Sequence, residues 1–541
     1  MMTLLPRPAE LSSAIAAWRD CLGDQAVLAA ADAQPLYGAC TTGVERAIPA
    51  ALRPRSADEV VAIVDIARRH AVPLYPISTG HNWGYGSANP ARDGCAVLDL
   101  SGLDRILELD AELGLVTLEP GVTQQHLADY LDRNGHHFLV PVTGAGPNCS
   151  LIGNALERGY GITPYADHFG AVTALEAVLP DGRLYRSALS ELGGEEVDRA
   201  FKWGVGPYLD GLFAQGSFGI VTRMTIALAP RPQRVEAFLF GVREDAGLEA
   251  AVAAVQRSLR AAGGVLGSIN LMNARRVLSM SVPYPRGRAG TDQIMTEDVV
   301  AALARENRIM AWTGVGALYG SEAVVKAARR VIRRILKPAT RQLVFLTPNS
   351  VARLNRLVGH VPVIRDGRLA AKARLLESSL HILAGRPGQV ALPLAYWRSG
   401  ISPPRDRDMD PARDGCGLIW YPPLVPMRPD AVRRYTQMVG EICAAHGIEP
   451  LITLTSLSDR CFDSSVPLLF DRRDPAQTAR AQSCHRALFD AGRREGFVPY
   501  RMAVHSMDWV TQSNAPFWDI VGKIKSAIDP AGIIAPGRYA P

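Results

Sequence analysis

The stretch that decides the fold is PISTGHNWGYGSANP, residues 76–90. It begins inside VPLYPIS (72–78), an apolar run whose length and composition predict a buried strand. Gly80, Gly84 and Gly86 let the backbone approach a ligand closely and direct successive N–H groups toward one centre. We therefore expect the turn to bind a pyrophosphate group, although glycine spacing by itself is weak evidence for a cofactor.

The segments around this turn alternate between helix and strand. Before it, Ser56 and Glu59 form a capping box, and the helix that follows has an apolar face of Val60, Val61, Val64 and Ala67. After it, AVLDLS (96–101) and LVTLEPG (115–121) predict strands, and TQQHLADYLDRNG (123–135) predicts a helix that ends at its glycine. The alternation continues to about Pro232, where longer amphipathic helices such as AVVKAARRVIRRIL (323–336) begin.

The composition is that of a globular protein with more than one domain. The chain has 541 residues, 48% hydrophobic and 21% charged, and its net charge of +6 includes no basic block. We therefore expect no nucleic-acid partner. No apolar stretch approaches the roughly 20 residues of a membrane span, and MMTLLPRPAELSSAIAAWRD (1–20) lacks the pattern of a secretory signal. Eight scattered cysteines without zinc spacing predict a cytoplasmic protein with no metal site.

The glycine turn resembles the pyrophosphate loop of the vanillyl-alcohol oxidase and p-cresol methylhydroxylase family of flavoenzymes. Further blocks resemble the family in the same order: LEPGVT (118–123), SLIGNALERGYGITPYADH (150–168), GVGPYLDGLFAQGSFGIVT (204–222) and IDPAGIIAPG (528–537). The resemblance is loose between about residues 233 and 450. It implies an α+β fold in which two α/β subdomains hold FAD without a Rossmann motif and a cap on an antiparallel sheet covers the flavin ring.

The resemblance also implies a domain division, an assembly and a set of cofactor contacts. The FAD domain would comprise residues 1–232, the cap 233–498, and a C-terminal segment, 499–541, would rejoin the FAD domain. The family suggests a homodimer. The residues expected to contact FAD are Ser78, Thr79, Gly80, His81, Asn82, Gly84, Gly86, Cys149, Ser150, Gly153, Asn154, Gly159, Ile220 and Arg538.

Two of these residues resemble the covalent flavin anchors of the related berberine bridge enzymes. His81 stands where those enzymes carry a histidine bonded to the flavin 8α-carbon, and Cys149 where they carry a cysteine bonded to C6. The alternatives are a histidine that binds backbone or phosphate and a small buried cysteine. The cap stretch DRCFDSSVPLLF (459–470) has Asp463 and Ser464 near the position of the family's usual anchor, but no His or Tyr. The resemblance thus predicts FAD attached through both His81 and Cys149.

At the substrate end, Tyr500 and Arg501 resemble the family's Tyr-Arg pair, which binds a phenol oxygen together with a tyrosine of the glycine loop, here Tyr85. Two phenol donors and a guanidinium would stabilise the phenolate of a small aromatic substrate. The resemblance implies hydride transfer from a benzylic carbon to flavin N5 through a quinone methide, followed by reoxidation of the flavin by O2.

The base of the reaction is not evident in the sequence. The family's oxidases often carry an aspartate in the loop that corresponds to residues 142–148, where this chain has no carboxylate. His168 and His505 are candidates, but structural roles are the stronger expectation for both. Trp397, Trp420 and Tyr421 could line the cap side of the pocket or belong to the core.

Three other functions remain open at this stage. The chain could be a dehydrogenase that passes electrons to a cytochrome, or a berberine-bridge-like oxidase of a larger natural product or a sugar. It could also be a flavin-binding module without catalysis, although the presence of Tyr85, Tyr500 and Arg501 argues against that reading.

Overall fold

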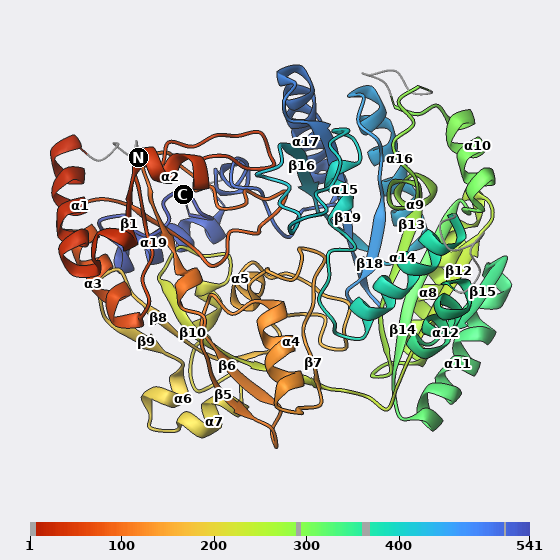
Figure 1. Ribbon diagram of the computed structural model, residues 1–541, viewed down its shortest axis with the longest axis horizontal. Helices are drawn as coiled ribbons and strands as arrows, with labels where there is room; N and C mark the ends of the chain where they lie inside the picture. Colours follow the sequence, from red (N-terminus) through yellow and green to blue (C-terminus); the bar gives the residue numbers. More distant parts are fainter. Residues whose placement is uncertain (1–6, 288–293, 360–367, 513–514, 541) are drawn as a thin grey trace.

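The computed structural model describes residues 7–287, 294–359, 368–512 and 515–540, so the first six residues of the N-terminal stretch discussed above lie outside it. The chain forms two adjoining halves (Figure 1). The N-terminal part, red to yellow, and the dark blue C-terminal segment make up one half, and the green to light blue segment makes up the other.

The first half begins with a four-stranded sheet in the order β1 (Val27–Ala29), β2 (Ala50–Leu52), β4 (Ala96–Asp99), β3 (Leu74–Ile77). Helix α3 (Ala57–Arg69) begins as predicted at Ser56, whose hydroxyl accepts the Glu59 N–H at 3.2 Å. The Glu59 carboxylate reaches the N–H of Arg55 instead of that of Ser56, one residue beyond the usual capping box. The C-terminal segment joins this sheet, because Leu74 exchanges backbone hydrogen bonds with Ile533 and Ala535.

A five-stranded antiparallel sheet follows, in the order β5 (Ile106–Asp110), β6 (Leu115–Leu118), β10 (Ile220–Ala227), β8 (Val172–Val178), β9 (Leu184–Arg186). Helix α4 (Gln124–Arg133) is capped by the Thr123 hydroxyl, and Gly135 follows it with φ +69°. The short helix α5 (Leu151–Leu156) is capped by the Ser150 side chain, which accepts the Gly153 N–H. The strands and helices predicted around the glycine turn are therefore confirmed, with bounds slightly shorter than the sequence indicated.

The second half is built on an eight-stranded antiparallel sheet. Its order is β15 (Gln342–Leu346), β12 (Arg234–Val242), β14 (Trp312–Gly320), β13 (Leu266–Asn273), β18 (Thr453–Ser456), β19 (Cys461–Asp471), β16 (Cys416–Tyr421), with β17 (Leu424–Pro426) also paired to β19. Helices α8 (Leu248–Ala261), α11 (Glu322–Leu336), α16 (Pro429–Ala445) and α17 (Pro475–Glu495) contribute to its core. This mixed architecture with an antiparallel cap sheet confirms the predicted α+β fold class.

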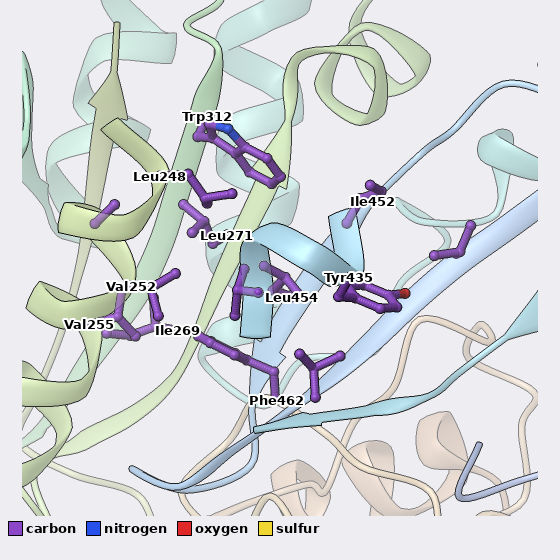
Figure 2. Close-up of a cluster of buried hydrophobic side chains, with 14 of the residues drawn as sticks. Leu248, Val252, Val255, Ile269, Leu271, Trp312, Tyr435, Ile452, Leu454 and Phe462 are labelled. Atoms are coloured by element: carbon purple, nitrogen blue, oxygen red, sulfur yellow. The ribbon is translucent and has the colours of Figure 1, made fainter. Parts of the chain in front are cut away.

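The two faces of the cap sheet differ in polarity. Figure 2 shows Leu271 of β13, Leu454 of β18 and Phe462 of β19 in the core, with Val252 and Val255 of α8 packed near them. Successive strand residues point to opposite faces, so the residues between these apolar ones point away from the core. Those residues include Asn270, Thr453 and Asp463, and they face the first half of the molecule.

All strands of the cap sheet lie between Arg234 and Asp471, which is consistent with the division that we propose into residues 1–232, 233–498 and 499–541. Within the described ranges, the structure contains no helix with both the length and the apolar character needed to cross a bilayer.

Candidate active site

A cavity of about 430 Å³ lies where the glycine turn, the start of α5, the cap sheet and the C-terminal segment meet. Its volume is within the range of small-molecule and cofactor pockets. Most of the residues predicted to contact FAD or substrate line it: Ser78, Thr79, Gly80, His81, Asn82, Tyr85, Cys149, Ser150, Gly153, Asn154, Gly159, Tyr500, Arg501 and Arg538.

Gly84, Gly86 and Ile220 lie outside this lining, and the surroundings of the two glycines give them a packing role. Gly84 has φ +76°, and a Cβ there would lie 2.2 Å from the Trp420 ring. A Cβ on Gly86 would lie 2.6 Å from the Val504 side chain. These glycines therefore let the cap and the C-terminal segment pack against the turn. Ile220 is buried in the core of the first half.

The glycine turn and the start of α5 are held together by short polar contacts. The Ser150 N–H donates to Thr79 Oγ1 at 3.2 Å, and the Ser150 hydroxyl accepts the Gly153 N–H at 2.9 Å and donates to the Pro120 carbonyl at 2.6 Å. A Cβ on Gly153 would lie 3.0 Å from the Ser78 hydroxyl, so a larger residue would push the two segments slightly apart. Both segments thereby border the cavity in a fixed arrangement.

Arg501 is the centre of a buried charge cluster. Its Nε donates to Glu157 at 3.0 Å, its Nη2 donates to Asn82 Oδ1 at 2.5 Å, and its Cζ lies 4.1 Å from the centroid of the Tyr85 ring. Arg538 donates to the other oxygen of Glu157. Burial alone would raise the pKa of Glu157, but the two guanidinium groups lower it below its usual value. One carboxylate between two arginines leaves the cluster with a net positive charge beside the cavity.

Glu157 was not among the predicted site residues, although it lies within the block 150–168. Its position in that block, directly after the last residue of α5, could have indicated it. Its two partners come from the other end of the chain, so its role depends on tertiary structure.

Tyr85 and Tyr500 line the same region, and their hydroxyl groups form no hydrogen bond with any residue in the described part of the chain. Burial raises the pKa of both phenols above the usual value, so both hydroxyls are protonated at neutral pH. Together with Arg501 they present donors to the cavity.

Asp463 on β19 is a buried carboxyl group that the sequence analysis had not assigned a catalytic role. Its Oδ1 has no hydrogen-bond partner within the described residues, while its Oδ2 accepts from the Ser465 hydroxyl at 3.3 Å. Burial raises the pKa of Asp463 to about 7, and the effects of Ser465 and Arg501 oppose this rise. The alternation of β19 directs Asp463 and Ser465 into the cavity and Phe462 and Ser464 away from it.

His81 and Cys149 both line the cavity. The His81 ring stacks on Trp83 with centroids 5.0 Å apart, and burial lowers the His81 pKa, which favours the neutral imidazole. Burial raises the pKa of the Cys149 thiol. Farther along the glycine turn, Ser87 Oγ and Asn89 Oδ1 are buried without a hydrogen-bond partner among the described residues. Unpaired polar atoms in a cavity of this volume fit a polar cofactor such as FAD.

Neither His168 nor His505 lines the cavity. Burial lowers the pKa of each to about 4, so both are neutral. Of the three cap aromatics, Trp420 lines the cavity, whereas Tyr421 is fully buried in the cap core because adjacent strand residues point to opposite faces. Trp397 packs in a neighbouring apolar cluster, where its indole N–H donates to the Val282 carbonyl.

Comparison with known proteins identifies both the cofactor domain and full-length relatives. Residues 48–188 match the family model described as FAD binding domain. The chain is 38% identical to 1'-carboxy-chondrochloren decarboxylase of Chondromyces crocatus, covering 98% of this chain and 97% of the relative. It is 28% identical to the 4-cresol dehydrogenase [hydroxylating] flavoprotein subunit of Pseudomonas putida, covering 98% of this chain and 95% of that one.

Solved structures agree over the whole length. The structure of p-cresol methylhydroxylase with substrate bound superposes with a TM-score of 0.86 at 26% identity and covers 98% of this chain and 97% of its own. The 4-ethylphenol oxidase of Gulosibacter chungangensis, solved as an isoeugenol complex, gives a TM-score of 0.88 at 23% identity, with 99% of each chain covered, and supports the fold. With an FAD-binding domain, near-complete coverage of these relatives and a cavity between cap and glycine turn, the chain belongs to the vanillyl-alcohol oxidase and p-cresol methylhydroxylase family of FAD-dependent oxidoreductases.

Proposed function

We propose that this chain is an oxidase that removes hydride from the benzylic carbon of a para-substituted phenol. The observation that carries the proposal is that Tyr85, Tyr500 and the Arg501 guanidinium line one cavity, where the two hydroxyls have no hydrogen-bond partner among the described residues. Hydrogen bonds to a charged oxygen are the strong ones. Three such donors around a phenol oxygen would lower its pKa and hold the substrate as a phenolate.

A bound phenolate is the electron source for the reaction. Its negative charge pushes electrons toward the para carbon, so hydride can leave the benzylic position and a quinone methide remains. FAD, when bound, supplies the hydride acceptor at N5, and O2 restores its oxidised form with release of H2O2. Tyr85, Tyr500 and Arg501 contribute by fixing the oxygen end of the substrate and stabilising its charge in a site shielded from water.

Asp463 is the residue that we propose as the base. The quinone methide either takes up water, which must lose a proton, or loses a proton from its side chain. Asp463 lines the cavity, its Oδ1 has no hydrogen-bond partner among the described residues, and its pKa of about 7 suits proton transfer at neutral pH. This assignment would explain how the chain works without a carboxylate in residues 142–148.

We also propose that FAD is bound through His81 at the 8α-carbon and through Cys149 at C6. Both side chains border the same cavity, one from the glycine turn and one from the residue before the α5 cap. Two bonds to the ring would raise its reduction potential by withdrawing electron density. We expect the protein to act as a cytoplasmic homodimer.

The electron acceptor and the substrate have alternatives. The Pseudomonas putida relative is named a dehydrogenase flavoprotein subunit, which keeps open a reaction that passes electrons to a cytochrome. Rapid reoxidation of the reduced flavin in air with peroxide formation would favour the oxidase. A berberine-bridge-like reaction would be favoured if bulky or glycosidic substrates turned over while simple 4-alkylphenols failed.

A second candidate function is oxidative decarboxylation, because the Chondromyces crocatus relative is named a decarboxylase. The same hydride removal would produce a quinone methide, which is an electron acceptor. If the adjacent carbon carries a carboxylate, loss of CO2 leaves its bonding electrons to form a carbon–carbon double bond and restores the aromatic phenolate. This reaction needs the same oxygen clamp and a substrate that bears a carboxylate.

The phenolate clamp is tested by Tyr500→Phe with Tyr160→Phe as a matched control, since Tyr160 lines the cavity and packs edge-on against Tyr500. Loss of one hydrogen bond to a charged oxygen should weaken binding of 4-alkylphenol inhibitors roughly 10- to 100-fold. Tyr160→Phe should change it much less. Binding is measured by titrating the flavin absorbance of the holoprotein. Unchanged affinity in Tyr500→Phe would remove the clamp from the mechanism.

A further inference from the structure

The cap side of the cavity contains an arginine that has no counter-ion among the described residues. Arg276 lines the cavity near the start of α9 (Ala274–Ser281), and its Nε is buried without a hydrogen-bond partner. Its guanidinium makes one contact within the described residues, from Nη1 to the Ser279 hydroxyl at 3.3 Å. Burial lowers the pKa of Arg276 to about 10, with no carboxylate acting against this effect. The side chain is nevertheless charged at neutral pH.

The preceding residue shows how this protein treats a buried arginine that serves structure alone. Arg275 donates to Glu449 at 2.6 Å, to Glu297 at 2.8 Å and to the Met295 carbonyl at 2.8 Å. Its charge and most of its donors are therefore satisfied. A partly buried guanidinium that lacks such partners is energetically unfavourable, which indicates that an anion from outside the chain completes the site.

Two more cavity-lining side chains on the same face of the cap sheet have unsatisfied polar atoms. Asn270 on β13 makes no side-chain hydrogen bond with any described residue; its Oδ1 is a buried acceptor, and its Nδ2 is the donor that a carboxylate could use. The Thr453 hydroxyl, at the start of β18, is buried and also has no partner in the described chain. In the antiparallel pair of β13 and β18, Met272 lies opposite Thr453 and Asn270 lies opposite Thr455. The side chains of Asn270 and Thr453 are therefore on neighbouring strands, near the point where β13 ends and α9 begins.

We propose that Arg276, with Asn270 and Thr453, binds a carboxylate of the substrate, so that the natural substrate is a phenol with a carboxylate on its side chain. This inference rests on the proposed function. A guanidinium fork matches the two oxygens of a carboxylate, and a single cation with neutral donors suits one negative charge. A phosphate monoester carries more charge and more acceptor oxygens than this site can pair.

The sheet register separates this carboxylate site from Asp463. Asp463 and Asn270 both lie opposite Thr455, so strand β18 stands between them, and Thr453 is two residues farther along β18, which corresponds to roughly 7 Å along the strand. The phenol oxygen end, at Tyr85, Tyr500 and Arg501, comes from the glycine turn and the C-terminal segment instead. The cavity thus has an anion-binding group at the cap and another at the FAD domain.

The test uses the holoprotein and three probes: 3-(4-hydroxyphenyl)propanoate, its methyl ester and 4-propylphenol. Dissociation constants come from titration of the flavin absorbance, and anaerobic flavin reduction gives the rate. The wild type should bind the acid more tightly than the ester. Arg276→Gln should weaken acid binding about 30-fold or more, the loss expected when one partner of a buried charge pair is removed, and should change ester binding little.

Arg276→Lys keeps the charge and should retain part of the preference for the acid over the ester. Thr453→Val leaves the charge unchanged and should reduce this preference by a smaller factor than Arg276→Gln does. Equal affinity of the wild type for acid and ester, or an acid preference that persists in Arg276→Gln, would overturn the carboxylate site. Equal weakening of acid and ester with an altered flavin spectrum would also overturn it, because Arg276 would then serve the flavin. Reduction by 4-propylphenol tests the proposed function separately, since that probe has no carboxylate.

Discussion

Replacement of Asp463 by Asn should abolish the rise of activity with pH while making the protein more stable. A base must be deprotonated to accept a proton, and the pKa of Asp463 is raised by burial to about 7. In the wild type kcat/KM should therefore increase about tenfold per pH unit below 7 and level off above it. In Asp463→Asn this increase should be absent, and kcat should fall roughly 100-fold or more, the usual contribution of a positioned base.

The stability of the same variant changes in the opposite direction. A carboxyl pKa moved from 3.8 to about 7 corresponds to roughly 4 kcal/mol. The folded protein binds this proton more tightly than the unfolded chain, so the penalty is absent below pH 4, grows as the pH rises and is complete above about 7. Asn carries no charge, so Asp463→Asn should be more stable than the wild type by up to about 4 kcal/mol at pH 8, and the difference should shrink toward pH 5.

Ser465→Ala provides the matched control, because the Ser465 hydroxyl donates to the Asp463 carboxylate at 3.3 Å and favours its charged form. Without that donor the pKa should rise further, so the activity limb should move to higher pH and remain present. The assays are steady-state kinetics with a 4-alkylphenol from pH 5 to pH 9 and denaturant unfolding at pH 5 and pH 8. A wild-type pH profile in Asp463→Asn, or lower stability at pH 8, would refute the reasoning.

Two further predictions concern the cofactor and the packing of the glycine turn. Tryptic peptides that contain His81 and Cys149 should each carry the mass of the flavin. The variants His81→Ala and Cys149→Ala should remove the two attachments one at a time. Peptides of unmodified mass in the wild type would exclude covalent attachment. Gly84→Ala should destabilise the protein by about 1–3 kcal/mol more than Gly23→Ala, as measured by denaturant unfolding. The new Cβ at position 84 would lie 2.2 Å from the Trp420 ring, whereas Gly23 has a comparable positive φ but open space around it. Equal losses for the two variants would mean that backbone strain alone decides the effect.

Much of the first half could be predicted from the sequence because its signals are local. A hydroxyl at Ser56 or Thr123 caps the helix that starts at the next residue, and the apolar periodicity of 323–336 indicates the face that α11 buries. The ordered blocks around the glycine turn identified the family and led to Tyr85, Tyr500 and Arg501, which the structure brings to one cavity.

The remainder of the site depended on contacts between distant segments. Glu157 matters because Arg501 and Arg538, more than 340 residues later, converge on its carboxylate. Asp463 and Arg276 carry no motif, and the register and alternation of the cap strands direct them into the cavity.

The sequence by itself determined the family, and it predicted the cofactor turn and the trio Tyr85, Tyr500 and Arg501 that we propose to bind a phenol oxygen, because these depend on residue types at short spacing or on long matching blocks. Tertiary structure alone decided that Gly84 packs against the Trp420 ring and that Trp420 faces the cavity while Tyr421 faces the core. It also decided that Asp463 and Arg276 each keep a buried polar atom without a partner among the described residues. The reason is that burial and charge pairing are set by what lies across the sheet, and a linear sequence does not specify which strands become neighbours.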